Sequence, residues 1–232
     1  MFFDAAGTLV RVRGGVGEQY AAVARRFGVE ADPRALAREF PAAFRAAPPM
    51  AFPGASPAEV PGLERRVWQG LVRRVFEGAG MLATGGAGWF EDYFDAVYRH
   101  FEDASVWDVY PDVWPILGTL RARGHQIGVI SNFDGRFLGI ADGLGLARWF
   151  DSVTLSSRVG AVKPQREIFA HALAAHGVEP GEALHVGDSP AEDVEGALAA
   201  GLGAVLIDRD NRHAGLSSLP RVTSLDQILQ LL

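Results

Sequence analysis

The sequence contains no cysteine, which excludes disulfide bonds, thiolate metal sites and a cysteine nucleophile. It also contains no apolar run of about 20 residues that could span a bilayer, and no basic segment leading into the apolar stretch of a signal peptide. The formal net charge of -6 argues against nucleic acid as a partner, because phosphate backbones are bound through basic surface. We therefore expect a cytoplasmic protein whose partner is neither a nucleic acid nor a membrane. Nothing in the sequence indicates its oligomeric state.

Lysine is almost as scarce as cysteine. Lys163 is the only lysine in the chain, which otherwise uses arginine for its permanently basic side chains. A lone lysine is usually a solvated surface residue. In a chain that otherwise uses arginine, however, it points to a position where the bulkier, planar guanidinium group cannot replace an ammonium group.

The spacing of apolar residues divides the sequence into two parts. Between residues 17 and 102 they recur every three or four positions, which predicts helices at 18–27, 33–44, 60–76 and 89–101. From Pro111 onward, short apolar strands alternate with helices. We expect these strands at 127–130, 152–155, 183–186 and 204–207, and the helices at 112–123, 136–144, 165–176, 191–200 and 225–231.

This alternation predicts an α/β fold, in which a Rossmann-like, doubly wound parallel sheet forms the core and an α-helical cap is inserted into it. We assign residues 1–12 and 108–232 to the core and residues 13–107 to the cap. A chain of 232 residues is long enough for one large domain with such an insert. Only three residues precede Asp4, so either the first strand is short or the true start of the protein lies upstream of Met1.

Several polar residues fall at the ends of predicted strands. Asp4, Ser131 with Asn132, and Asp188 directly follow apolar strands, and Lys163 stands just before a helix. A doubly wound sheet gathers such positions at one edge, where ligands bind. Two carboxylates there repel each other unless a cation lies between them, and oxygen ligands with a phosphorylated substrate favour Mg²⁺. The sequence therefore predicts a magnesium site with a carboxylate nucleophile and a cationic group facing it.

Four short motifs in this order resemble those of the haloacid dehalogenase (HAD) superfamily, in the subgroup with a helical cap after the first motif. They are Asp4-Ala5-Ala6-Gly7-Thr8-Leu9, Ile130-Ser131-Asn132, Lys163-Pro164 and Gly187-Asp188-Ser189-Pro190-Ala191-Glu192-Asp193. The similarity covers essentially the whole core, whereas the insert matches only in its position and helical character.

The resemblance implies a role for each matching residue. Asp4 would be the nucleophile and, with Asp188 and the backbone carbonyl of Ala6, a ligand of Mg²⁺. Lys163 would neutralise the nucleophile and the phosphate. The phosphoryl oxygens would be held by Thr8, Ser131, Asn132 and Lys163. Asp193 would support the metal site from outside its ligands.

Ala6 departs from the usual family pattern, in which the second residue after the nucleophile is an acid that donates and accepts a proton. The backbone carbonyl at this position should still bind metal, but the proton donor is missing. A positioned general acid contributes about 10²–10⁴-fold in rate, so substrates with poor leaving groups should suffer most.

From these motifs we expect a Mg²⁺-dependent phosphatase that acts on a small phosphorylated metabolite through an aspartyl-phosphate at Asp4. One alternative is a HAD-fold protein that binds a phosphorylated ligand without turnover. A second is a 2-haloacid dehalogenase, which ejects a halide and needs no proton donor, although Asp188 would repel a haloacid carboxylate in the absence of a metal. A phosphonoacetaldehyde hydrolase would require a lysine in the cap, and this cap has none.

Three other features have ordinary structural explanations. Asp134 is expected to cap the helix after the second motif, and the alternative is that it replaces the missing acid. His185, within an apolar strand, is expected to be buried and hydrogen-bonded. The aromatic residues of the insert are expected to pack its helices together, although part of this set could line a pocket.

Overall fold

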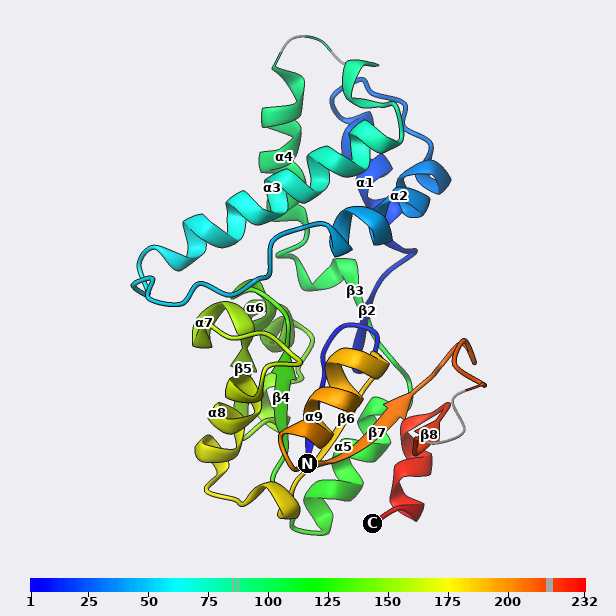
Figure 1. The fold of residues 1–232 in the computed structure, drawn as a ribbon. Coiled ribbons are helices and arrows are strands. Elements are labelled where there is room, and N and C mark those ends of the chain that lie inside the picture. Colours follow the sequence, from blue (N-terminus) through cyan, green and yellow to red (C-terminus); the bar gives the residue numbers. More distant parts are fainter. Residues whose placement is uncertain (85, 87, 216–218) are drawn as a thin grey trace.

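The computed structural model describes residues 1–232 except 85, 87 and 216–218 (Figure 1). Within the described residues, six strands form one sheet in the order β5-β4-β1-β6-β7-β8, and every neighbouring pair is parallel. The strands are β1 (Phe2–Phe3), β4 (Gly128–Ser131), β5 (Ser152–Leu155), β6 (Leu184–Gly187), β7 (Gly203–Ile207) and β8 (Arg221–Val222). The predicted α/β class with a doubly wound parallel sheet is confirmed. The direction of winding reverses at β1, the position where such sheets bind ligands.

Helices cover both faces of this sheet, and β1 turns one aromatic side chain toward the helices on each face. Phe3 packs in the cluster formed with α5 and α6, and Phe2 packs in the cluster formed with α8 and α9. The helices are α5 (Val113–Ala122), α6 (Arg136–Gly143), α7 (Ser156–Val159), α8 (Arg166–His176) and α9 (Gly196–Ala199). Successive strand residues point to opposite faces, so a strand buried on both sides is apolar throughout.

The inserted residues form a helical unit with an apolar core of its own. Its helices are α1 (Val16–Arg25), α2 (Pro33–Arg45), α3 (Val60–Gly78) and α4 (Trp89–His100). Figure 1 shows these four helices together at one end of the molecule, beyond the sheet. Tyr20, Leu36, Phe76 and Tyr93 are buried among them, which agrees with the helical periodicity of this part of the sequence.

A short two-stranded ribbon joins the helical unit to the sheet, and the periodicity did not predict it. Strand β2 (Val10–Val12) pairs antiparallel with β3 (Trp107–Val109). Of the assigned limits of the cap, residue 13 directly follows β2 and residue 107 begins β3, and the division into core and cap remains a proposal.

The remaining differences from the predicted elements are small. Strand β8 and helix α7 were not predicted, and the helix expected at 191–200 begins as a π-helical segment (Pro190–Glu195) before α9. The segment expected as a last helix is a 3₁₀-helix (Leu225–Gln230), and other 3₁₀ turns occur at Leu82–Thr84, Ala104–Val106, Ala147–Trp149 and Pro180–Glu182. No described helix combines the length and the hydropathy needed to cross a membrane.

The pairing of β1 with β4 leaves no space for a side chain at Gly128. Gly128 lies opposite Phe2, and a Cβ atom at this position would stand 2.7 Å from the buried Phe2 ring and 2.8 Å from His176 Nε2. We predict that Gly128→Ala lowers the free energy of unfolding by about 1–3 kcal/mol, the usual cost of overpacking. Urea unfolding monitored by circular dichroism measures this change.

Gly139→Ala is the matched control, because Gly139 lies on α6 with open space where its Cβ would be. Alanine favours a helix over glycine by about 0.5–1 kcal/mol, so this variant should be as stable as the parent or more stable. Equal stability of the two variants would contradict the packing described here.

Candidate active site

The ends of the central strands bring three of the predicted residues together. Asp4 follows β1 directly, Ser131 is the last residue of β4, and Asp188 follows β6. The backbone N–H of Asp4 donates to the carbonyl of Val186 at 2.9 Å, which continues the β1–β6 pairing up to Asp4. The Ser131 hydroxyl donates to Asp4 Oδ1 at 3.0 Å.

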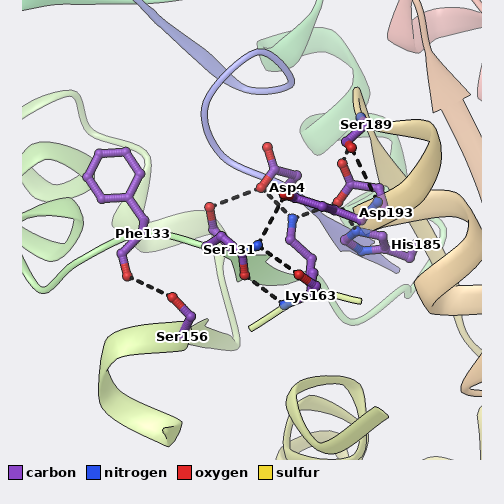
Figure 2. A network of polar contacts seen from close by, with 10 residues as sticks. Asp4, Ser131, Phe133, Ser156, Lys163, His185, Ser189 and Asp193 are labelled. Carbon is purple, nitrogen blue, oxygen red and sulfur yellow. Dashed lines mark hydrogen bonds and ion pairs between the residues drawn. The ribbon is translucent and has the colours of Figure 1, made fainter. Parts of the chain in front are cut away.

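Lys163 supplies the positive charge at the centre of this cluster. Its ammonium group donates to Asp4 Oδ1 and to Asp193 Oδ1, both at 2.6 Å, and its side chain is 1% exposed (Figure 2). Burial alone would lower the pKa of Lys163, but the Asp193 and Asp4 carboxylates outweigh burial and raise this pKa above its ordinary value. A buried ammonium group is tolerated because two carboxylates contact it directly.

The two carboxylates respond differently to this environment. Burial raises the pKa of Asp4, and the Lys163 ammonium offsets only part of that effect. Burial also acts to raise the pKa of Asp193, but Lys163 and His185 outweigh it and hold that pKa well below its usual range. Asp193 is therefore the permanently charged partner of Lys163.

Asp193 is fixed by further hydrogen bonds. His185 Nε2 lies 2.8 Å from Asp193 Oδ1, and the backbone N–H of Ser189 donates to Asp193 Oδ2 at 2.9 Å (Figure 2). Gly187 permits this arrangement, because a Cβ atom there would collide with the Asp193 carboxylate. The expectation that His185 is a buried, hydrogen-bonded histidine is confirmed.

Asn132 holds the Lys163 segment in place. Its Oδ1 accepts the backbone N–H of Lys163 at 2.8 Å, and its Nδ2 donates to the Lys163 carbonyl and to Glu192 Oε2, each at 3.0 Å. The side-chain amide predicted to contact phosphate is therefore engaged with protein groups. Glu192 also lines the cavity, and the sequence motifs predicted no role for it.

The carboxylates also offer a place for a metal ion. One oxygen each from Asp4, Asp188 and Asp193 lie within 4.8 Å of one another. Gly7, at a φ of 89°, approaches Asp188 so closely that any Cβ atom would collide with its carboxylate. Desolvation, together with the charges of Asp4 and Asp193, raises the pKa of Asp188 to about 7. A divalent cation relieves this kind of repulsion, and oxygen ligands suit Mg²⁺, so the residues present fit the predicted metal.

A cavity of about 740 Å³ opens above this cluster and is lined by residues of both the sheet edge and the helical unit. Asp4, Ala6, Lys163 and Asp188 lie in its wall. Thr8 is not among the described residues that line this cavity. Thr8 is fully buried, and its carbonyl accepts the guanidinium of Arg209 at 2.7 Å. Its predicted contact with phosphate remains untested.

Polar contacts join the helical unit to the core, and no sequence pattern predicted them. Glu64 of α3 accepts the backbone N–H of Gly135 at 2.9 Å, and Trp68 donates to Asp134 Oδ2 at 2.6 Å. Asp134 also accepts the backbone N–H of Arg136, the first residue of α6, at 2.9 Å, although Gly135 rather than Asp134 stands at the N-cap position. Because it is fully buried and paired with Arg136, Asp134 is poorly suited to replace the missing acid.

Known proteins resemble this chain in sequence and in fold. The family described as haloacid dehalogenase-like hydrolase matches residues 1–201. Haloacid dehalogenase-like hydrolase domain-containing protein 3 of Homo sapiens is 36% identical over 205 residues, which cover 88% of this chain and 80% of that protein. Phosphoserine phosphatase of Thermus thermophilus is 36% identical over 137 residues, 55% of this chain and 53% of that enzyme. The crystal structure of a HAD phosphatase from Thermococcus onnurineus has a TM-score of 0.64 at 23% identity and covers 99% of this chain and 95% of that one, a likeness in fold.

The raised pKa of Asp188 predicts a pH dependence of stability in the metal-free protein. In the unfolded chain an aspartate titrates near pH 3.9, whereas folded Asp188 titrates at about 7. Between these values unfolding releases a proton, so the free energy of unfolding should fall as the pH rises from about 4 to 7. Because the pKa of Asp193 is lowered, the stability that Asp193 contributes is lost as the pH falls below this window.

The Asp188→Asn variant should be less sensitive to pH over this window, because it lacks the carboxylate that retains the proton. Urea midpoints of both proteins, measured with a chelator present at several pH values, provide the comparison. Parallel curves for the two proteins would contradict the assigned environment of Asp188.

Proposed function

The chain belongs to the haloacid dehalogenase-like hydrolases, and on that premise we propose that it is a Mg²⁺-dependent phosphatase of small phosphorylated molecules. The observation that carries the proposal is the position of Asp4, whose Oδ1 is held by both Lys163 and Ser131. Within the described part of the chain no group is hydrogen-bonded to its Oδ2. That oxygen is therefore the one available to attack a phosphorus atom at the cavity floor.

The first step forms a bond between the Asp4 carboxylate and phosphorus while the bond from phosphorus to the leaving oxygen breaks. Lys163 stays within hydrogen-bond distance of the nucleophile and neutralises charge that the phosphoryl group brings. Mg²⁺ bound by Asp4, Asp188 and the Ala6 carbonyl would supply a further positive charge for the phosphoryl oxygens.

In the second step, water attacks phosphorus and releases inorganic phosphate, which restores the Asp4 carboxylate. Ala6, which lines the cavity, carries no group that could donate a proton to the leaving oxygen or remove one from the water. Leaving groups of low basicity depart without such help, whereas alkoxides need it. This gap should restrict the substrates or slow their turnover.

The relatives support phosphate as the substrate group. One is named phosphoserine phosphatase and another, from Methanothermobacter thermautotrophicus, glyceraldehyde 3-phosphate phosphatase, each matching about half of this chain. Dehalogenation is the weaker candidate, because Asp188 places an additional acid beside the nucleophile. A protein that binds a phosphorylated ligand without turnover remains the main alternative.

Turnover of an aryl phosphate tests the proposal directly. We expect release of inorganic phosphate from 4-nitrophenyl phosphate in the presence of Mg²⁺, loss of that activity with EDTA, and its recovery when Mg²⁺ is restored. Asp4→Asn, which keeps the shape of the nucleophile and removes its charge, should be inactive. Absence of turnover across a broad phosphate panel would favour the binding protein, and metal-independent halide release from 2-haloacids would favour the dehalogenase.

The gap at Ala6 generates a separate prediction. Ala6→Asp should raise kcat/KM for alkyl phosphates by about 10²-fold or more, because a carboxyl group restores proton transfer to the leaving alkoxide. Aryl phosphates, which leave without that proton, should gain far less.

The matched control is Ala6→Asn, because the asparagine side chain has the shape of aspartate but cannot transfer a proton in this way. An equal gain from both substitutions would assign the effect to packing, and no gain from Ala6→Asp would mean that another group already donates the proton.

A further inference from the structure

Aromatic side chains form much of the cavity wall. Six of them come from the cap helices, the segment after them and the loop after β4: Phe40, Phe44, Trp68, Tyr98, Phe101 and Phe133. Several of these rings contact one another. The centroids of Phe40 and Phe44 are 5.8 Å apart with the rings stacked, and those of Phe44 and Trp68 are 6.5 Å apart. The wall is therefore continuous over α2 and α3.

Four of these six rings pack partly against the apolar core of the helical unit, but none of the six is fully buried. Phe44 is 46% exposed, and the other five are partly accessible, whereas Phe76 and Tyr93 of the cap interior are fully buried. An aromatic set that faces a cavity and remains accessible is unusual for a purely structural cluster, because most large apolar side chains are buried where packing allows it. The aromatic stripe of the sequence thus divides into a buried core and a cavity wall.

Two polar groups in this wall, the Arg136 guanidinium and the Trp68 indole N–H, already have partners. The Arg136 guanidinium donates to both oxygens of Asp134, at 2.9 and 2.7 Å, and its carbon lies 4.0 Å from the centre of the Tyr98 ring. The Trp68 indole N–H also donates to Asp134, at 2.6 Å. The charge of Arg136 is therefore balanced inside the wall.

The distribution of charge disfavours an amino acid as the organic part of the substrate. Among the described residues, the acids that line the cavity are Asp4, Asp188, Glu192 and Asp193, all of which belong to the reaction centre. An ammonium group placed against the cap would find no carboxylate there. Arg11 and Arg212 line the cavity as well, but both are exposed. The Arg11 guanidinium carbon lies 5.1 Å from the centre of the Tyr110 ring, and Arg212 forms an ion pair with Asp210.

We propose that the substrate is a phosphate monoester of a flat, apolar group, an aryl or fused-ring phosphate, whose ring contacts the wall formed by Phe44, Trp68 and Phe133. This inference rests on the proposed phosphatase function and specifies its substrate class. Phe133 follows Ser131 by two residues and Asn132 by one, so the wall begins next to the expected phosphate position. Aromatic faces recognise flat rings by stacking and by excluding water.

The gap at Ala6 leads independently to the same class. An aryl oxide is a weaker base than a sugar or serine alkoxide, so it can leave without a proton from the enzyme. The recognition site and the reaction centre thus select the same kind of molecule.

The experiment must separate recognition from leaving-group chemistry. Phenyl and 2-naphthyl phosphate have leaving groups of similar basicity but differ by one ring, and kcat/KM for the naphthyl ester should be about tenfold higher. Among esters with alkoxide leaving groups, 2-naphthylmethyl phosphate should be preferred to O-phosphoserine. Equal rates within both pairs would overturn the proposal.

A variant pair locates the effect. Phe44→Ala should reduce the naphthyl-over-phenyl preference about three- to tenfold, the value of one aromatic contact. Leu198→Ala removes an equally exposed apolar side chain outside the cavity and should leave the preference unchanged. The same loss in both variants would overturn the assignment of the wall.

Binding of substrate analogues that cannot be hydrolysed distinguishes failure of this inference from failure of the proposed function. By calorimetry, 2-naphthylmethylphosphonate should bind at least about tenfold more tightly than methylphosphonate. This preference without turnover of any ester would refute the hydrolase and support the ligand class. Turnover of esters without this preference would support the hydrolase and refute the ligand class.

Discussion

The contact of one buried ammonium group with two carboxylates is the constraint on which the rest of the site depends. Lys163 lies 2.6 Å from both Asp4 and Asp193, and Asp188 brings a third carboxylate within 4.8 Å of the other two. A single positive charge does not balance three acids, and desolvation together with this excess of negative charge raises the pKa of Asp188. The cluster is therefore suited to a divalent cation, and it gains further negative charge when a phosphate approaches.

Much of this site could be predicted from the sequence, because its residues follow short apolar strands whose order places them at one edge. Asp4, Ser131 and Asp188 are examples. The roles of other side chains depended on contacts between distant segments. Asn132 binds Lys163 rather than facing the cavity freely, and Asp134 joins Trp68, 66 residues away. No local pattern records such pairs. The short strands β2 and β8, of three and two residues, were not predicted either, because so few residues display no periodicity.

The absence of a side-chain acid at Ala6 and the aromatic cavity wall are independent features of the chain. One lies in the loop after β1 and the other mainly on the inserted helices. In the proposed function, the first would limit which leaving groups can depart, and the second would limit which organic groups can bind. The named phosphatase relatives match only about half of the chain, so their substrates need not be those of a cavity that the insert and the core line together.

The most direct test of the central claim is a crystal structure of the protein grown with Mn²⁺ and beryllium fluoride, with anomalous data that locate the metal. The account predicts an anomalous peak between the Asp4 and Asp188 carboxylates, beryllium fluoride joined to Asp4, and the Lys163 ammonium in contact with it. A metal peak elsewhere, or an Asp4 side chain that binds neither group, would contradict it.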